Sequence, residues 1–118
     1  MQAQDNKILL ANSIERALKL DCAVIVEGIR DKRALKTLGF RHVFTINKPL
    51  YALAEEVASC YKQVIILTDL DAEGKRLYRR LKRELQRLGV RIEDGFRLAI
   101  LRHTKIRQIE GLRSAENV

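Results

Sequence analysis

Residues 64–85, VIILTDLDAEGKRLYRRLKREL, join three patterns that decide the fold. The apolar run at 64–68 predicts a buried strand. Carboxylates follow at every second position, and then leucines recur at steps of four, four and three among many arginines and lysines. This period predicts a helix that buries a leucine stripe and ends at Gly89. The stripe would comprise Leu77, Leu81, Leu85 and Leu88.

The same alternation of apolar runs and helical periods extends over most of the chain. Further strands are expected at 22–26, 43–46 and 96–101, and further helices at 1–20, 31–38 and 51–61. The helix at 31–38 is expected to begin with Asp31 as its cap and to stop at Gly39. Apolar strands that alternate with helices are typical of a parallel sheet covered on both faces. The predicted fold class is therefore α/β.

The 118 residues are enough for one domain with its own core and too few for two ordinary domains. We expect a single domain over 1–118, with a core at about 22–101, an N-terminal helix at 1–20 and a tail at 102–118. The tail is expected to form a helix that packs three apolar side chains, Ile106, Ile109 and Leu112. No apolar run approaches the roughly 20 residues of a spanning helix, and no secretion signal is evident. A cytoplasmic protein without a membrane partner is expected.

The net charge indicates the kind of partner, and the spacing of the cysteines indicates their role. The formal net charge of +8 points to a polyanionic partner, and nucleic acid, RNA or DNA, is the first candidate. Cys22 and Cys60 belong to no motif with zinc-ligand spacing, so both are expected to be core thiols.

Acidic residues follow two of the predicted strands. Glu27 follows the strand at 22–26, and Asp69 and Asp71 follow the strand at 64–68. Because function in open parallel sheets collects at the carboxyl ends of the strands, these side chains are expected to share one edge. Carboxylates about 4 Å apart repel by roughly 4 kcal/mol at an effective dielectric constant near 20, so a cluster of them binds protons or cations. Oxygen ligands without nearby histidine or cysteine favour Mg²⁺ or Mn²⁺.

The cations that follow these acids suit the same chemistry. Carboxylates loaded with divalent ions attract a phosphodiester, and neighbouring Lys75, Arg76 and Arg79 could hold the flanking phosphates. The competing interpretation is structural, because an aspartate after a strand often caps the next helix and an arginine-rich helix face is often solvated surface.

Two motifs, AVIVEGIRD at 23–31 and VIILTDLDAEG at 64–74, resemble the Toprim domain, a catalytic module of topoisomerases, bacterial-type primases, recombination-associated proteins and some nucleases. The shared pattern is a strand ending in Glu-Gly, an Asp three residues after that Gly, and a later strand ending in Asp-x-Asp with a Gly three residues further on. The resemblance covers about 22–101. It implies a compact Rossmann-like fold, in which a mostly parallel sheet of about four strands is flanked by helices on both faces.

By position, the resemblance implies roles for four acidic residues. Glu27 would act as general acid or base, or help to hold a second ion, and Asp69 and Asp71 would bind Mg²⁺ or Mn²⁺. Glu73 matches the third acid of the topoisomerase version of the motif and would be a further ligand. Lys32 is a candidate phosphate contact that the resemblance does not itself supply.

The short chain leaves no room for a strand-passage, helicase or zinc module. It is therefore similar to the small stand-alone Toprim proteins and to the Toprim ribonucleases that trim ribosomal RNA precursors. This similarity implies metal-dependent cleavage of structured RNA or DNA, by the chain alone or with a recruiting protein. The main alternative is a non-catalytic Toprim module that binds nucleic acid or a protein, such as a primase or repair accessory.

Two other classes of protein place acids after strands and fit less well. Haloacid-dehalogenase phosphatases have the glycine directly after the second aspartate, whereas Gly74 comes two residues later here. A response-regulator receiver needs an acidic pair after its first strand and a lysine after its last, and Arg102 and Lys105 are poor substitutes for that lysine.

Overall fold

Four short strands form one sheet through the centre of the molecule. In the computed structural model, which describes residues 3–114, their order is β2-β1-β3-β4. β1 (Ala23–Val26) pairs with β2 (Val43–Thr45) and with β3 (Gln63–Ile66), and β4 (Arg91–Ile92) pairs with the free edge of β3. All three pairings are parallel because a helix lies in each connection between successive strands. The predicted α/β class is confirmed.

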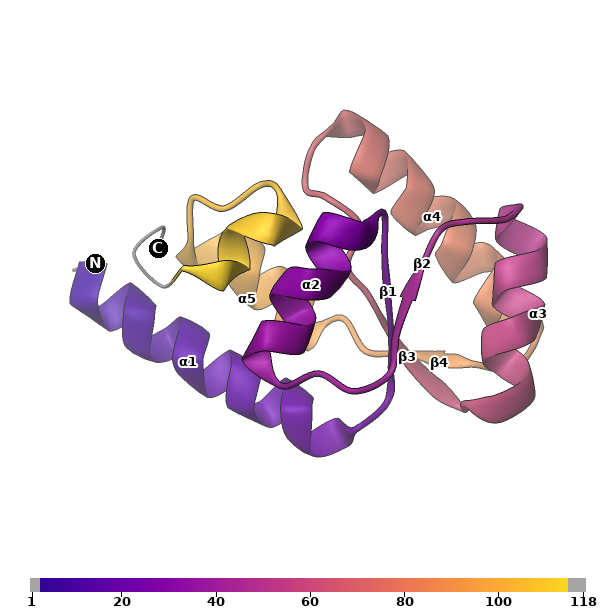
Figure 1. The fold of residues 1–118 in the computed structure, drawn as a ribbon, viewed down its shortest axis with the longest axis horizontal. Coiled ribbons are helices and arrows are strands. Elements are labelled where there is room, and N and C mark those ends of the chain that lie inside the picture. The colour runs from indigo at the N-terminus through magenta and orange to yellow at the C-terminus, as the bar shows by residue number, and fades with distance from the viewer. Residues whose placement is uncertain (1–2, 115–118) are drawn as a thin grey trace.

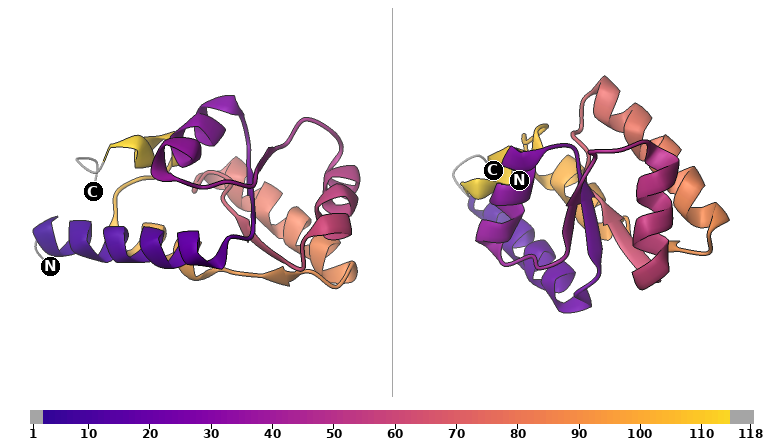
Figure 2. Two further views of the ribbon diagram at one scale, coloured as in Figure 1. Left: turned by 60° about the horizontal axis from the view of Figure 1, so that its bottom comes forward. Right: turned by 45° about the vertical axis from the view of Figure 1, so that its right-hand side comes forward.

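Helices cover both faces of this sheet (Figure 1). One side carries α1 (Ala3–Leu20), α2 (Ile29–Leu38), α5 (Gly95–His103) and the 3-10 helix η1 (Ile109–Arg113). The other side carries α3 (Leu50–Cys60) and α4 (Ala72–Arg87). Figure 2 shows the two groups separated by the strands.

Each face of the sheet has its own apolar core because successive residues of a strand point to opposite sides. In β1, Val24 and Val26 contribute to the core under α1, α2 and α5, whereas Ala23 and Ile25 contribute to the core under α3 and α4. All four side chains are buried. A strand with apolar residues at every position is therefore what a two-sided sheet requires.

Residues 96–101, predicted as the fourth strand, form most of α5 instead. Phe96 and Ile100 are buried four residues apart on one face of this helix, whereas Leu98 and Leu101 are exposed. The prediction was wrong because a short apolar run has the same appearance in a buried strand and in a helix. The fourth strand is the two-residue β4, which is too short to show any pattern.

Two helix boundaries differ from the predicted ones in detail. The N-cap of α2 is Gly28, three residues before the predicted cap, and Asp31 lies in the first turn. Asp31 Oδ2 accepts the backbone N–H of Gly28 at 3.1 Å, so Asp31 caps the helix from inside it. The predicted stops hold, because Gly39 (φ 109°) and Gly89 (φ 83°) both adopt the left-handed conformation that ends a helix.

Some predicted core positions lie at the surface. In α4, Leu81 and Leu85 are buried, but Leu88 follows the end of the helix and is exposed. Cys22 is half-buried, whereas Cys60 is exposed, so the prediction of a core thiol is wrong for Cys60. Its position explains this result, because the buried face of α3 ends at Val57, almost one turn before Cys60.

The two ends of the chain contribute to the same core, on the side of the sheet that carries α2. The N-terminal helix predicted at 1–20 is present over 3–20, and residues 1–2 and 115–118 lie outside the described part. The three apolar residues of the tail are buried as predicted, although the helix there is a short 3-10 turn; they are Ile106, Ile109 and Leu112. Within residues 3–114, no helix combines the length and apolar character that crossing a bilayer would need.

Candidate metal and phosphate site

Glu27 and Asp69, at the carboxyl ends of β1 and β3, lie side by side. Glu27 Oε2 accepts the backbone N–H of Asp69 at 2.7 Å, although the two residues are 42 positions apart in the sequence. Asp69 Oδ1 in turn accepts the backbone N–H of Ile109 at 2.8 Å. The shared edge predicted for Glu27 and Asp69 is therefore present, and η1 is attached to it.

An open cavity of about 420 Å³ lies at this edge. Four carboxylates from separate parts of the chain line it, Glu27, Asp31, Asp69 and Glu110. The lining also contains one cation, Arg30. The lining is therefore acidic, although the chain as a whole carries a net charge of +8.

The carboxylates of this cavity oppose each other's ionisation. Burial raises the pKa of Glu27, and the charges of Asp69, Asp71 and Asp31 raise it further, against the hydrogen bond from the Asp69 backbone. Burial likewise raises the pKa of Asp31, with added repulsion from Asp69 and Glu110. The folded protein therefore bears a free-energy cost when these groups are ionised, and a bound cation would relieve it.

Asp71 and Glu73 do not line the cavity. Asp71 is the N-cap of α4, where its Oδ1 accepts the backbone N–H of Gly74 at 2.7 Å. The capping interpretation is thus correct for Asp71, which is still close enough to raise the pKa of Glu27. Glu73 accepts two hydrogen bonds from Arg76 at the surface, at 2.6 and 3.0 Å, and this pairing lowers the pKa of Glu73.

The donor set of the cavity fits a hard divalent cation. Within residues 3–114, no three histidine, cysteine or acidic side chains converge as a preformed metal cage. Mg²⁺ does not require one, because proteins usually hold it with one or two carboxylates while water and substrate phosphates complete its coordination. Glu27 and Asp69 each use one oxygen for a backbone N–H, which leaves the second oxygen as a candidate ligand.

The predicted phosphate contacts fall into two groups. Lys75 and Arg79 are exposed on α4, and neither forms an ion pair with any described residue. Arg76 is paired with Glu73, so its charge is largely neutralised. Lys32 is half-buried on α2 and lies outside the cavity lining. The cation that lines the cavity is Arg30 instead.

Arg97 supports the end of β3 and was missed because residues 96–101 were expected to form a strand. This buried side chain, only 7% exposed, donates through Nη1 to the backbone oxygen of Thr68 at 2.6 Å and through Nη2 to that of Asp69 at 3.2 Å. Its guanidinium also lies over the ring of Tyr78, 4.6 Å from the centroid. Arg97 thereby fixes the backbone from which the Asp69 carboxylate extends.

Gly74 allows the first turn of α4 to approach that same backbone. Thr68 Oγ1 donates to the carbonyl oxygen of Gly74 at 2.6 Å, and a Cβ at Gly74 would lie only 1.8 Å from the carbonyl oxygen of Asp69. No side chain fits there. The glycine that follows Asp-x-Asp in the sequence is therefore a requirement of close packing.

Glu110 had no local sequence signal that could reveal it. It reaches the cavity because the preceding loop is attached to the β3–α4 turn, where the backbone N–H of Leu70 donates to the carbonyl oxygen of Arg107 at 2.6 Å. The hydrogen bond from Ile109 to Asp69 completes this attachment. Such contacts depend on tertiary structure alone.

Comparison with known proteins agrees with this geometry. The Toprim domain matches residues 22–102. A UPF0292 protein from Pyrococcus abyssi is 34% identical over 119 residues, covering 100% of this chain and 89% of the relative. A UPF0292 protein from Methanocaldococcus jannaschii is 37% identical over 99 residues, covering 80% and 77%. A solved structure from Aquifex aeolicus superposes with a TM-score of 0.79 at 26% identity, covering 86% of this chain and 95% of that one.

These matches agree with the residues that form the site. The matched Toprim region contains the Glu-Gly and Asp-x-Asp motifs at the ends of β1 and β3, and it implies a metal-dependent function on nucleic acid. The names of the relatives state no activity. The chain therefore belongs to the Toprim domain family, among its small UPF0292 proteins.

Proposed function

We propose that this protein is a divalent-metal-dependent nuclease that cleaves phosphodiester bonds in structured RNA or DNA, alone or with a recruiting protein. The observation that carries the proposal is the acidic cavity in a strongly basic chain. Glu27 and Asp69 line it together with Asp31 and Glu110, and Glu27 Oε2 accepts the backbone N–H of Asp69 at 2.7 Å. A protein that only held phosphates would gain nothing from carboxylates that repel them.

In this proposal, Asp69 and Asp71 hold Mg²⁺ or Mn²⁺ at the start of α4, with Glu27 facing them. Glu73 joins this set only when its pair with Arg76 opens. The cation, when bound, supplies Lewis-acid chemistry by lowering the pKa of a coordinated water and neutralising charge on the phosphate.

Glu27 is the proposed general base. A carboxylate is a suitable general base for the water that attacks a phosphodiester. The hydrogen bond from the Asp69 backbone fixes Glu27 Oε2, so the carboxylate keeps one orientation. The second oxygen is the one proposed to accept a proton from the attacking water.

Flanking phosphates are proposed to contact cations around the cavity. Arg30 lines it directly, and Lys75 and Arg79 extend from the first turns of α4, which begins beside it. Lys32 lies in the first turn of α2 and could reach the same strand of nucleic acid. Arg76 is expected to contribute less while Glu73 neutralises it.

The test of this function is incubation of the purified protein with labelled single- and double-stranded RNA and DNA in Mg²⁺ or Mn²⁺. Cleavage is expected from the wild type and from the control Glu55→Gln, an exposed carboxylate on α3. No cleavage is expected from Glu27→Gln or Asp69→Asn. Metal-independent binding by all four proteins without cleavage would instead identify a non-catalytic binding module.

Metal binding can be measured separately from catalysis. Mg²⁺ or Mn²⁺ is expected to raise the melting temperature by roughly 5 °C at ten times its Kd, because that ratio stabilises the fold by about 1.4 kcal/mol. The double variant Asp69→Asn with Asp71→Asn should lose this effect while its metal-free stability stays equal or rises. A metal response like that of the wild type would place the ion elsewhere.

A further inference from the structure

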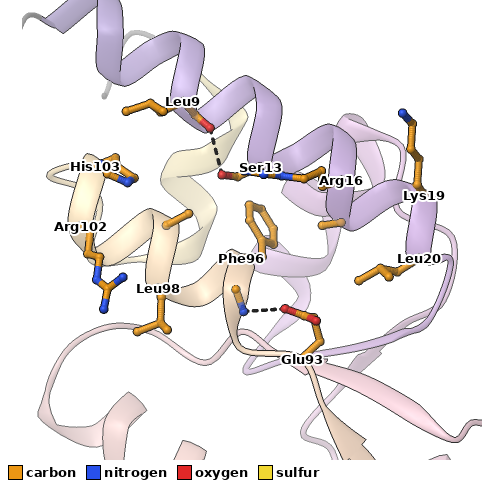
Figure 3. A pocket seen from close by; sticks show the side chains of 13 residues that line it. Leu9, Ser13, Arg16, Lys19, Leu20, Glu93, Phe96, Leu98, Arg102 and His103 are labelled. Carbon is orange, nitrogen blue, oxygen red and sulfur yellow. Dashed lines mark hydrogen bonds between the residues drawn. The ribbon is translucent and has the colours of Figure 1, made fainter.

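A second cavity, of about 670 Å³, lies between α1 and α5 (Figure 3). Its floor is apolar and includes Leu9, Ala17, Phe96 and Ala99. In Figure 1, α1 lies at the bottom of the molecule, whereas the start of α4, where the acidic site is built, lies at the top. We call this second cavity the α1–α5 groove, and nothing in the proposed nuclease chemistry uses it.

Large apolar side chains are exposed on the two helices that form the α1–α5 groove. On α1, Ile8 is 52% and Leu20 42% exposed, and on α5, Leu98 is 40% and Leu101 37% exposed. Leu20 and Leu98 belong to the lining itself. Single exposed apolar residues are ordinary, but two in the lining of one cavity, with two more on the same pair of helices, indicate a surface that another molecule covers.

The rim of the α1–α5 groove is basic. Arg16 and Lys19 lie on α1 and Arg102 lies on α5, and all three line the groove (Figure 3). Lys19 pairs with Glu15 at 3.6 Å, but neither Arg16 nor Arg102 forms an ion pair within residues 3–114. The one carboxylate of the lining, Glu93, accepts the backbone N–H of Gly95 at 2.6 Å. The arginines therefore leave a positive charge for a ligand to meet.

We propose that the α1–α5 groove binds an acidic amphipathic helix of a partner protein. Such a helix would place apolar residues at i, i+3 or i+4 and i+7 on the leucine and phenylalanine floor. Its aspartates and glutamates would meet Arg16 and Arg102. This inference does not depend on the proposed nuclease activity, and the distance between the two regions would allow nucleic acid and the partner to bind together.

Other occupants fit the α1–α5 groove less well. A second copy related by two-fold symmetry would bring two basic rims and two chains of net charge +8 together. Nucleic acid would leave the apolar floor without a counterpart. A lipid bilayer is flat, whereas Phe96 is only 3% exposed at the base of the groove and could not reach it.

The test uses a displayed library of peptides about 16 residues long, enough for a helix of roughly 24 Å. Leucine is fixed at helical spacing and the remaining positions are randomised. Selection against the full chain should enrich aspartate and glutamate beside the leucines. Affinity of the selected peptides should fall about tenfold or more, equivalent to about 1.4 kcal/mol, in the double variant Arg16→Glu with Arg102→Glu. It should fall similarly in Leu98→Asp.

A matched control separates the α1–α5 groove from overall charge. Lys62→Glu with Arg87→Glu makes the same change in net charge at exposed positions away from the groove, and it should leave peptide affinity unchanged. Failure to enrich acidic peptides, or equal binding to both double variants, would overturn the proposal. The proposal would also be overturned if the wild type sedimented with phosphatidylserine vesicles, or formed a dimer, and the double variant Arg16→Glu with Arg102→Glu did not.

Discussion

Replacing Gly74 with alanine is expected to destabilise the protein strongly, although the residue lies inside a helix. By helix propensity alone, Gly→Ala in a helix interior stabilises by up to about 1 kcal/mol. The packing around Gly74 predicts a loss of stability instead. A Cβ at Gly74 would lie 1.8 Å from the carbonyl oxygen of Asp69 and 2.5 Å from its carbonyl carbon, whereas ordinary contacts begin at 3.4 Å.

The size of the effect follows from what would have to move. Both sides of this contact are backbone, so no side-chain rotation can relieve it, and the cost starts at the upper end of the range for overpacking, about 3 kcal/mol. Shifting the Asp69 backbone would also weaken the hydrogen bonds that it makes with Glu27 and Arg97, at about 1 kcal/mol each. We expect a loss of about 4 kcal/mol after the gain in helix propensity is subtracted.

Urea unfolding followed by far-UV circular dichroism measures this loss. The control is Gly28→Ala, since nothing lies within 4 Å of a Cβ at Gly28, and it should cost at most about 1 kcal/mol for the poorer helix cap. The surviving folded fraction of Gly74→Ala should also lose its metal-dependent rise in melting temperature. A Gly74→Ala variant as stable as the wild type would refute the packing argument.

Further predictions concern the groups around the same edge of the sheet. Arg97→Met should lower the free energy of unfolding by about 2–4 kcal/mol, because the buried carbonyl of Thr68 and the part-buried carbonyl of Asp69 lose their donor. Arg97→Lys should recover part of this loss in the same urea titration. The raised pKa values of Glu27 and Asp31 mean that the folded protein holds these protons more tightly than the unfolded chain. Without metal, the melting temperature should therefore fall as the pH rises from the ordinary carboxylate pKa through the raised pKa values of these two groups. Asp31→Asn should make that fall smaller. A melting temperature that rises over this pH range would contradict the prediction. In fluorescence anisotropy, Arg79→Gln should weaken nucleic-acid binding and reduce its salt dependence by about one phosphate contact, more than Arg76→Gln does. Equal effects of the two variants would mean that the pair of Arg76 with Glu73 opens on binding.

The parts of the fold that could be predicted from sequence are those with a regular apolar pattern. The strands that carry Glu27 and Asp69 were located within one or two residues, because strands buried on both faces are apolar throughout. β4 has only two residues and offers no pattern, so the sequence predicts the fourth strand at the nearest apolar run, residues 96–101. That error also concealed Arg97, since a buried arginine is not expected within a central strand.

The site was predictable only where residues lie close to a strand end. Glu27 and Asp69 follow directly from the parallel arrangement, and their contact is present. Arg30 and Glu110 face the same cavity through the packing of α2 and η1, which no local pattern specifies. The metal and phosphate roles assigned to Asp71, Glu73 and Lys75 remain predictions for the experiments above.

The attachment of η1 to Asp69 sets the time at which the site can form during synthesis. Domains generally fold as units during synthesis, and here the last described segment supplies one wall of the cavity. The Ile109 N–H reaches Asp69, and Ile109 and Leu112 are buried in the core that faces α2. A nascent chain that has emerged only as far as α5 has every acidic residue of the Toprim motifs but an open, one-sided cavity. The acidic edge is thus completed only after η1 has been synthesised and has docked against Asp69.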